Sequence, residues 1–374
     1  MSSWDVVVVG VGGMGSVACA ELAARGARVL GLEQHTIGHA LGSSHGETRL
    51  YRHAYFEAPD YVPLMQRALR AWRRLEARAG EELVVETGLA LFGRPGSTLI
   101  AGAARAAREH ALEVERLSVA EAAARFPELR AEQLTEVLFE PAAGFLRVDA
   151  CVRAAARVAR EAGAEIVEGQ TVEKIEAMAT GAVVHTSRGE HHARRVIVAA
   201  GPWSARLLGS LGQRLTVRRK VLVWLPVDAR SHRVEAGAPA FGFDHPSGFF
   251  YGFPCIEPGV LKVAEHTGGA SVPEPDAVHR ELSPTDVDLL FRFVKTHLPR
   301  ARPEVLRHAV CLYTMSPDEH FLVGRHPEHA SILLAAGFSG HGFKFASAVA
   351  EALSDLALSG ETDLPIGFLN PGRF

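Results

Sequence analysis

A short glycine-rich loop between a predicted strand and a predicted helix constrains this chain more than any other feature. Residues 6–9 are four valines in a row, a run typical of a strand buried on both faces of a parallel sheet. The loop that follows, residues 10–15, has the spacing GxGxxG. Small or apolar residues then recur at helical spacing as far as Gly26, and residues 27–33 predict a second strand. The segment therefore has the pattern of a βαβ unit.

Each glycine of the loop has a physical role in binding a dinucleotide. Gly10 permits a tight turn, Gly12 lets the main chain approach a pyrophosphate, and Gly15 lets the helix pack closely on the strand. The amides and dipole of the helix then favour a bound phosphate. Glu33 ends the second strand, where its carboxylate can accept hydrogen bonds from ribose hydroxyls. This context predicts dinucleotide binding, although the loop alone does not separate FAD from NAD.

Beyond this unit the sequence alternates between helices and two kinds of strand. Helical spacing recurs at residues 61–78, 98–110, 150–163, 285–298 and about 342–358. Strands are predicted at residues 84–92, 165–168, 172–177, 182–186, 195–200 and 332–336, and a long ordered loop or short helices at residues 34–60. A dense antiparallel pattern, which a parallel nucleotide-binding sheet would not supply, occurs at residues 217–227, 248–254 and 260–266. We therefore predict an α/β fold in which a second, mostly β domain is inserted into a nucleotide-binding domain.

Composition excludes several classes of protein. The chain has 40 Lys and Arg against 43 Asp and Glu, a net charge of -3, which gives no electrostatic basis for holding a nucleic acid. The start of the chain lacks the features of a secretory signal, and no apolar run approaches the roughly 18 residues of a membrane-spanning helix. No CxxC pair occurs among the four cysteines, Cys19, Cys151, Cys255 and Cys311. We predict a cytoplasmic protein without nucleic-acid or membrane partners.

Four further segments carry a resemblance to a known family. They are residues 42–55 (GSSHGETRLYRHAY), 251–254 (YGFP), 309–314 (AVCLYT) and 337–345 (GFSGHGFKF). Together with the glycine loop, they resemble the monomeric sarcosine oxidase and N-methyltryptophan oxidase family of flavin amine oxidases, and the resemblance runs from end to end of the chain. It implies a Rossmann-like, glutathione-reductase-like FAD-binding domain and an α+β substrate domain whose antiparallel sheet roofs the flavin. We place the FAD-binding domain at residues 1–82, 146–215 and 318–374, and the substrate domain at residues 83–145 and 216–317.

The same resemblance assigns residues to the cofactor. Cys311 matches the cysteine that binds FAD covalently, and Arg49 and His45 match residues near one face of the flavin, where positive charge stabilises the reduced, anionic ring. The glycine-rich turn at residues 340–342 can also direct main-chain amides at the flavin. The full set of expected cofactor residues is Gly10, Gly12, Gly13, Met14, Gly15, Glu33, Ser43, Arg49, Val172, Gly201, Cys311, Gly340, Gly342 and Lys344.

A second set is assigned to the substrate and to dioxygen. Arg52 and Lys344 match the two cations that hold a substrate carboxylate, because an arginine fork fixes a carboxylate in a plane and a lysine adds a point charge. Lys262 matches a lysine above the flavin that is assigned to oxygen activation. Pocket positions are matched by His266, His341 and Tyr313. From residue patterns alone, Cys311 could equally be an inert buried thiol, Lys344 and Lys262 outward-facing lysines, and the histidines structural partners.

These assignments predict an FAD-dependent oxidase of secondary amino acids, such as sarcosine, N-methyl-L-tryptophan or another N-methyl or cyclic amino acid. The amine would become an imine that hydrolyses, and dioxygen would become hydrogen peroxide, in a monomeric protein. Gly242 and Ser44 replace a methionine and a histidine of the sarcosine-specific members, which suggests a substrate larger than sarcosine.

Other readings stay open. A flavin dehydrogenase that uses a protein or quinone acceptor, an NAD-dependent dehydrogenase and a non-catalytic dinucleotide-binding module share parts of the same pattern. Glycines interrupt the loop that carries His35, His39, His45 and His53, so we predict no metal site.

Overall fold

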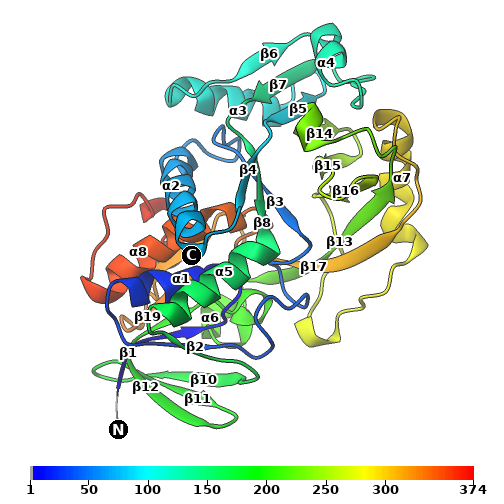
Figure 1. Cartoon of the computed structure of the whole chain (residues 1–374). Helices are drawn as coiled ribbons and strands as arrows, with labels where there is room; N and C mark the ends of the chain where they lie inside the picture. The colour runs from blue at the N-terminus through cyan, green and yellow to red at the C-terminus, as the bar shows by residue number, and fades with distance from the viewer. Residues whose placement is uncertain (1–2) are drawn as a thin grey trace.

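The computed structural model describes residues 3–374, in which one mainly parallel sheet carries the glycine loop (Figure 1). β1 lies between β2 and β12, β9 extends the sheet beyond β2, β19 pairs with β12, and all four of these pairings are parallel. The sheet consists of β1 (Trp4–Val9), β2 (Val29–Leu32), β9 (Glu165–Val167), β10 (Val172–Ala177), β11 (Ala182–Thr186), β12 (Gly189–Val198), β18 (Leu322–Arg325) and β19 (Ile332–Ala336).

The four valines of β1 are buried on both faces, as a central parallel strand requires. Val6 and Val8 face a helical layer, whereas Val7 and Val9 face the core on the other side of the sheet. The helical layer consists of α1 (Gly13–Ala24), α2 (Tyr61–Ala79), α5 (Val148–Glu161) and α8 (Ala346–Leu358). Because α1 packs against α5 and α8, segments from both ends and the middle of the chain hold the glycine loop.

The second large sheet is mainly antiparallel and forms the wall of the molecule opposite the glycine loop. Its strand order is β17 (Arg307–Met315), β13 (Thr216–Pro226), β16 (Val260–Glu265), β15 (Gly248–Gly252), β14 (Ala240–His245), β5 (Leu89–Gly93), β7 (Glu136–Glu140) and β6 (Glu115–Leu117). α7 (Pro284–His297) and α4 (Val119–Arg125) pack on one face, and α3 (Thr98–Glu109) packs near β5 and β7. This sheet supplies the predicted antiparallel strands, and the α/β fold class is confirmed.

A small sheet joins the two large ones and differs from the sequence-based expectation. It consists of β3 (Thr48–Tyr51), β8 (Gly144–Arg147) and β4 (Val84–Glu86). The prediction of only loops or helices at residues 34–60 was therefore wrong, because β3 lies there. The single strand predicted at residues 84–92 is also two strands, β4 and β5. They separate at Gly88, where φ is +72° and an added Cβ would lie 2.4 Å from the Phe139 ring.

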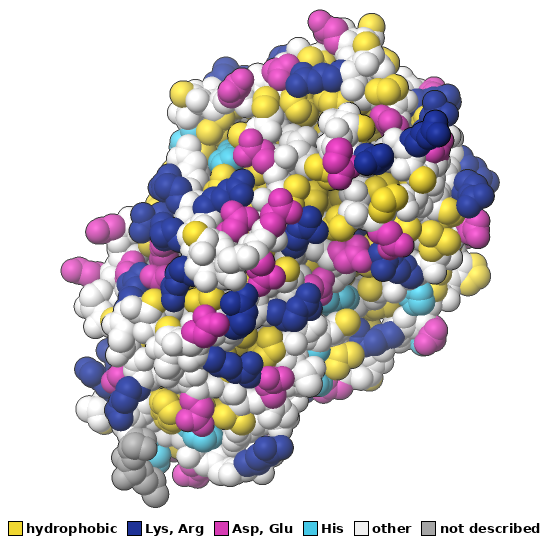
Figure 2. Space-filling view, viewed as in Figure 1, with side chains coloured by type: hydrophobic (Ala, Val, Ile, Leu, Met, Phe, Trp, Pro, Cys, Tyr) yellow, Lys and Arg dark blue, Asp and Glu magenta, His cyan; other side chains and the backbone are white. Residues whose placement is uncertain are grey.

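Short helical segments complete the described chain. They are α6 (Gly209–Gly212) and the 3-10 turns Gly201–Arg206, Val234–Ala236, Pro275–Ala277, Phe343–Phe345, Gly367–Leu369 and Pro371–Arg373. Within residues 3–374, no helix is both long enough and apolar enough to cross a membrane. Figure 2 shows basic and acidic side chains interspersed over one face of the molecule, without a large area of a single sign. The predicted division into two domains at the stated boundaries stays a prediction.

Candidate active site

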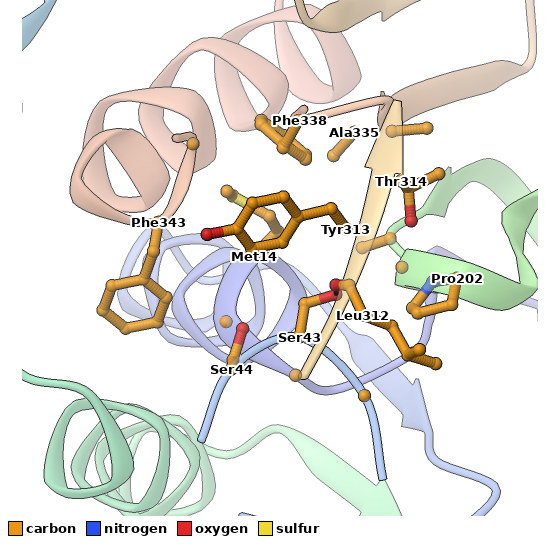
Figure 3. A pocket seen from close by; sticks show the side chains of 18 of the residues that line it. Met14, Ser43, Ser44, Pro202, Leu312, Tyr313, Thr314, Ala335, Phe338 and Phe343 are labelled. Carbon is orange, nitrogen blue, oxygen red and sulfur yellow. Dashed lines mark hydrogen bonds between the residues drawn. The ribbon is translucent and has the colours of Figure 1, made fainter. Parts of the chain in front are cut away.

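A large cavity lies where β1 and β2 end, opposite β17 (Figure 3). The chain leaves β1 toward β2 on one side and returns as β12 on the other, so the cavity lies at a switch point of the parallel sheet. About 220 Å³ is open to the centres of water-sized molecules, against about 10 Å³ in the next cavity. Figure 3 shows the ring of Tyr313 projecting into it from β17, beside Met14 and Phe338.

The glycine loop has the geometry that a pyrophosphate site needs. Gly10 has φ of +86°, and a Cβ there would lie 2.7 Å from the carbonyl oxygen of Ala199. A Cβ on Gly15 would lie 1.8 Å from the carbonyl oxygen of Gly10, so the first turn of α1 packs directly on the loop. A Cβ on Gly12 would meet nothing within 4 Å, which leaves the main chain accessible from the cavity. The loop therefore fits a phosphate-bearing dinucleotide such as FAD.

Glu33 is buried beside this loop and is held in place by main-chain amides. Its two carboxylate oxygens accept hydrogen bonds of 2.9 Å from the amides of Val11 and His35. These bonds fix the carboxylate at the end of β2, where it lines the cavity. Further predicted cofactor residues that line the same cavity are Gly13, Met14, Ser43, Val172 and Gly201.

The glycine-rich turn before α8 brings Lys344 and Tyr313 to the cavity. Gly340 has φ of +81°, and a Cβ there would lie 2.3 Å from the Tyr313 ring, so only glycine leaves room for that ring. Lys344 follows in the 3-10 turn Phe343–Phe345 rather than in the last helix itself. Trp72 of α2 donates a 2.8 Å hydrogen bond from Nε1 to the Lys344 carbonyl oxygen and stacks on Phe343.

Arg52 is a buried cation with unused hydrogen-bonding capacity. Its Nη2 donates to both carboxylate oxygens of Glu57 at 2.7 Å, while its Nη1 is buried without a partner. Its guanidinium carbon lies 4.3 Å from the ring centres of both Tyr55 and Phe56, which hold the group between two aromatic faces. The free Nη1 leaves one side of the guanidinium available to a ligand.

Lys344 is the second buried cation at this end of the cavity. Its Nζ donates a 2.7 Å hydrogen bond to the carbonyl oxygen of His341 and lies 5.2 Å from the centre of the Tyr55 ring. The ring of Tyr55 is therefore shared by Lys344 and Arg52. Burial, aided by the charge of Arg52 and opposed by that of Glu57, lowers the pKa of Lys344 to about 7.

The two predicted pocket histidines are buried and neutral. Burial lowers the pKa of His266 to about 3 and that of His341 to about 4. The Nε2 of His341 contacts the carbonyl oxygen of Glu319, and its Nδ1 lies 2.6 Å from the Tyr55 hydroxyl, so Nε2 carries the proton and Nδ1 accepts. His266 contacts the hydroxyl of Tyr313 at 3.3 Å, and both residues line the cavity.

Cys311 lies on β17, two residues before Tyr313 and on the same face of the strand. Its sulfur is 3.4 Å from Nη2 of Arg49 and 3.3 Å from the carbonyl oxygen of Ser43. Both of those residues line the cavity, although Cys311 itself lies just behind them. Burial raises the pKa of the thiols of Cys19 and Cys255 to about 12 and about 11, so neither is a ready nucleophile.

His45 and Lys262 are buried and do not line the large cavity. Lys262 Nζ donates to the carbonyl oxygens of Gly46 and Thr48 at 2.5 and 2.9 Å and to the Thr48 hydroxyl at 3.0 Å. Burial and the charge of Arg49 hold its pKa well below the usual range. Burial, aided by the charges of Arg49 and Lys262, lowers the pKa of His45 to about 3. The expectation that Lys262 faces inward from its strand agrees with this position.

Several residues at the cavity were not predicted from the sequence. Glu57 forms an ion pair with Arg52. The sequence feature that could have indicated this pair is an acidic residue five positions after the arginine in the same loop. The apolar part of the lining was also not predicted, because a strand pattern does not show which aromatic side chains face a ligand. It consists of Phe56, Leu89, Leu91, Phe249, Phe338 and Phe343.

The room predicted at Gly242 is already occupied. A Cβ there would lie 2.9 Å from Leu91 and 3.0 Å from Phe249, and both of these side chains line the cavity. The absence of a larger side chain at this position therefore lets Phe249 pack inward rather than opening free space.

The histidines of residues 34–60 do not converge on one point. His35 and His39 pack against each other and Trp203, while His53 pairs with Glu140 at 3.1 Å. Among residues 3–374, one group of three potential metal ligands has its ligand atoms within 4.8 Å of one another. It consists of His326, Glu328 and His329, in the turn between β18 and β19.

Comparison with known proteins agrees with this geometry. The chain belongs to the FAD-dependent oxidoreductase family, whose sequence profile matches residues 5–356. Within that family it is similar to monomeric sarcosine oxidase from Bacillus sp. (strain B-0618), with 36% identity covering 99% of this chain and 96% of the relative. It is also similar to N-methyl-L-tryptophan oxidase from Salmonella enteritidis PT4, with 35% identity covering 99% of both chains.

Solved structures give the same result for the fold. NikD, an unusual amino acid oxidase essential for nikkomycin biosynthesis, superposes in its open form with a TM-score of 0.86 at 27% identity, covering 99% of this chain and 98% of NikD. Glycine oxidase from Geobacillus kaustophilus superposes with a TM-score of 0.82 at 23% identity over the whole of both chains, which shows the shared fold. The predicted family, fold class and FAD-dependent oxidoreductase activity are confirmed.

Proposed function

We propose that this protein is an FAD-dependent oxidase of secondary amino acids. One observation carries the proposal: two buried cations, Arg52 and Lys344, lie at the end of the cavity that continues to the glycine loop. Arg52 has an Nη1 without a hydrogen-bond partner, and burial lowers the pKa of Lys344 to about 7. A ligand carboxylate would satisfy both groups, because it accepts several hydrogen bonds and carries the compensating charge.

FAD, when bound, supplies the acceptor for a hydride, which carries the two electrons of the oxidation. The residues of this chain position the substrate and control its protonation state. Arg52 and Lys344 hold the carboxylate, so that the neighbouring C–H bond has one fixed orientation. Because Arg49 adds a third cation nearby, a protonated amine is disfavoured, and the substrate binds with a neutral nitrogen. His266 is uncharged and adds no fourth positive charge.

The apolar lining supports a substrate whose side chain is apolar or cyclic. Phe56, Leu89, Leu91 and Phe249 form the part of the lining next to the Arg52 loop and the antiparallel sheet. Burying each methylene of a substrate side chain against such a wall contributes about 0.8 kcal/mol. A bulkier N-methyl or cyclic amino acid therefore has more to gain here than sarcosine. We propose a monomer, by analogy with the related monomeric sarcosine oxidase.

A panel of matched amines tests the proposed reaction. Sarcosine, N-methyl-L-tryptophan and L-proline should each be offered beside an analogue without the carboxylate, namely dimethylamine, N-methyltryptamine and pyrrolidine. We expect hydrogen peroxide from at least one acid and from none of the analogues, because the clamp needs a carboxylate. If no acid bleaches the flavin under anaerobic conditions, the proposed function is wrong. Bleaching without oxygen uptake would instead identify a dehydrogenase with another electron acceptor.

We further propose that FAD is attached covalently through Cys311. Arg49 lies 3.4 Å from the sulfur, where its guanidinium can stabilise negative charge as the bond forms. We expect acid-precipitated protein to stay yellow and Cys311→Ser protein to release its flavin into the supernatant. Cys255→Ser is the matched control, since that thiol is also buried but lies beside Val260 and Gly259 rather than beside Arg49. A colourless pellet from the unmodified protein would contradict the attachment.

A further inference from the structure

Lys262 borders a second, much smaller cavity that shares no lining residue with the large one. It has about 10 Å³ open to the centres of water-sized molecules, which is about the space of a single water. Its lining includes Glu47, Thr48, Trp224, Lys262 and Arg307. Most of these groups are polar, so the cavity suits a water molecule that contacts Lys262 from the side away from the substrate.

Glu47 lies between this cavity and solvent, and its backbone has an unusual conformation. It has φ of +69°, a left-handed conformation that costs a non-glycine residue of the order of 1 kcal/mol or more. Its carboxylate offsets that strain with two contacts: Oε2 accepts a 2.8 Å hydrogen bond from Trp224 Nε1, and Oε1 lies 2.7 Å from Nη2 of Arg307. The same left-handed turn aims the carbonyl oxygens of Gly46 and Thr48 at Lys262 Nζ.

The carboxylate of Glu47 is 37% exposed, whereas Lys262 is 4% exposed. Glu47 can therefore exchange protons with bulk water, while Lys262 cannot do so directly. The three hydrogen bonds that Lys262 donates all go to Gly46 and Thr48, so the residue is fixed beside the small cavity.

We propose that Lys262 gives a proton to the reduced oxygen and is then reprotonated from solvent by Glu47, through a water in the small cavity. Reduction of dioxygen to hydrogen peroxide takes two electrons and two protons. Reduced flavin in its anionic form supplies both electrons and one proton, so the second proton comes from solvent. The inference rests on the proposed oxidase function and on the resemblance, which implies that Lys262 serves dioxygen reduction. It adds a positioned acid at Glu47 and a route separate from the amine cavity.

The charged groups that face Lys262 are consistent with such a relay. Arg49 disfavours the protonated form of Lys262, whereas Glu47, Cys311 and Asp149 favour it. Asp149 accepts a hydrogen bond from the main-chain amide of Glu47 and is held in place by it. Glu47 contributes an exposed carboxylate to this cavity, and the same carboxylate accepts a hydrogen bond from Trp224.

Glu47→Gln tests the relay, because glutamine keeps the shape and the acceptor for Trp224 but cannot donate a carboxylic proton. The flavin is first reduced with dithionite, so that no amine is involved, and is then mixed with dioxygen. We expect reoxidation to slow by about 10²-fold, with a solvent deuterium isotope effect larger than that of the unmodified protein and partial recovery on adding formate. Glu235→Gln is the control, since Glu235 is an exposed carboxylate that lies 3.3 Å from Arg233 and does not line the small cavity.

A readout other than turnover separates a relay from a simple change of charge. The pKa of Lys262 is measured by NMR of ¹³C-labelled lysine in the cofactor-loaded protein, with Lys262→Met assigning the signal. If Glu47→Gln lowers that pKa but formate restores nothing and the isotope effect is unchanged, Glu47 acts by charge alone and the relay is wrong. Reoxidation within twofold of the unmodified rate would also overturn it. Fast reoxidation in Lys262→Met would instead remove Lys262 from the reaction.

Discussion

Replacing Lys344 by methionine lowers kcat/KM for a secondary amino acid roughly 10²-fold or more, because removing one charge of a buried charge pair typically costs about 2–5 kcal/mol. Methionine has a similar length, so the fold and the flavin content are retained. Both KM and kcat change, since the clamp binds the carboxylate and also orients the reacting C–H bond. Steady-state peroxide formation measures the effect, with Lys174→Met as the control on an exposed lysine.

The pH dependence of ligand binding gives this prediction an independent check. Methoxyacetate has a carboxylate and no amine, so its binding reports the clamp alone. Burial lowers the pKa of Lys344 to about 7 in the free protein. The lysine is therefore charged below that pH and loses its charge as the pH rises through it, which leaves Arg52 as the cation. We expect the Kd to rise across this range in the unmodified protein and to stay flat in Lys344→Met. Equal profiles would exclude Lys344 from the clamp.

Replacing Lys262 by methionine slows reoxidation of the reduced flavin by about 10²–10³-fold, the usual loss when a group that stabilises developing charge is removed. The residue lies outside the substrate cavity, so flavin reduction by amine under anaerobic conditions should change only a few-fold. Stopped-flow absorbance separates the two half-reactions. A larger loss in reduction than in reoxidation would show that the lysine serves the substrate.

Lys220→Met is a demanding control for this variant. Lys220 is also a buried lysine on the antiparallel sheet, and burial lowers its pKa to about 8. It pairs in register with Cys311 but does not line the cavity. If losing any buried lysine of this sheet slowed reoxidation, both variants would be slow. We expect Lys220→Met to reoxidise at close to the unmodified rate.

Features set by neighbouring residues could be predicted from the sequence. The four valines, the glycine loop and the first helix are local patterns, and the structure places them as β1 and α1. A capping box is another local pattern, and at Ser118 the hydroxyl accepts a 3.2 Å hydrogen bond from the Glu121 amide. The cation pair was suggested by the resemblance and not by periodicity, because Arg52 and Lys344 are distant in sequence.

Structural features that depend on contacts between residues distant in the sequence could not be predicted. β3 forms only because β8 supplies its hydrogen-bonding partner, and the residues around β3 have no strand periodicity. The break between β4 and β5 follows from the close approach of Phe139 to Gly88, which the local sequence does not show. The same holds for Phe249, whose place in the cavity wall is set by packing against Gly242 and Leu91.

The order of strands in the parallel sheet has a consequence for biosynthesis. β1 and its glycine loop are synthesised long before β19, and β12 acquires its neighbour β19 only after residue 336 has been synthesised. α8, which covers α1, emerges later still. A nascent chain therefore carries the phosphate loop long before it can enclose a ligand. Capture of the flavin is completed only after β19 and α8 have been synthesised, and a chain truncated before β19 should yield colourless protein.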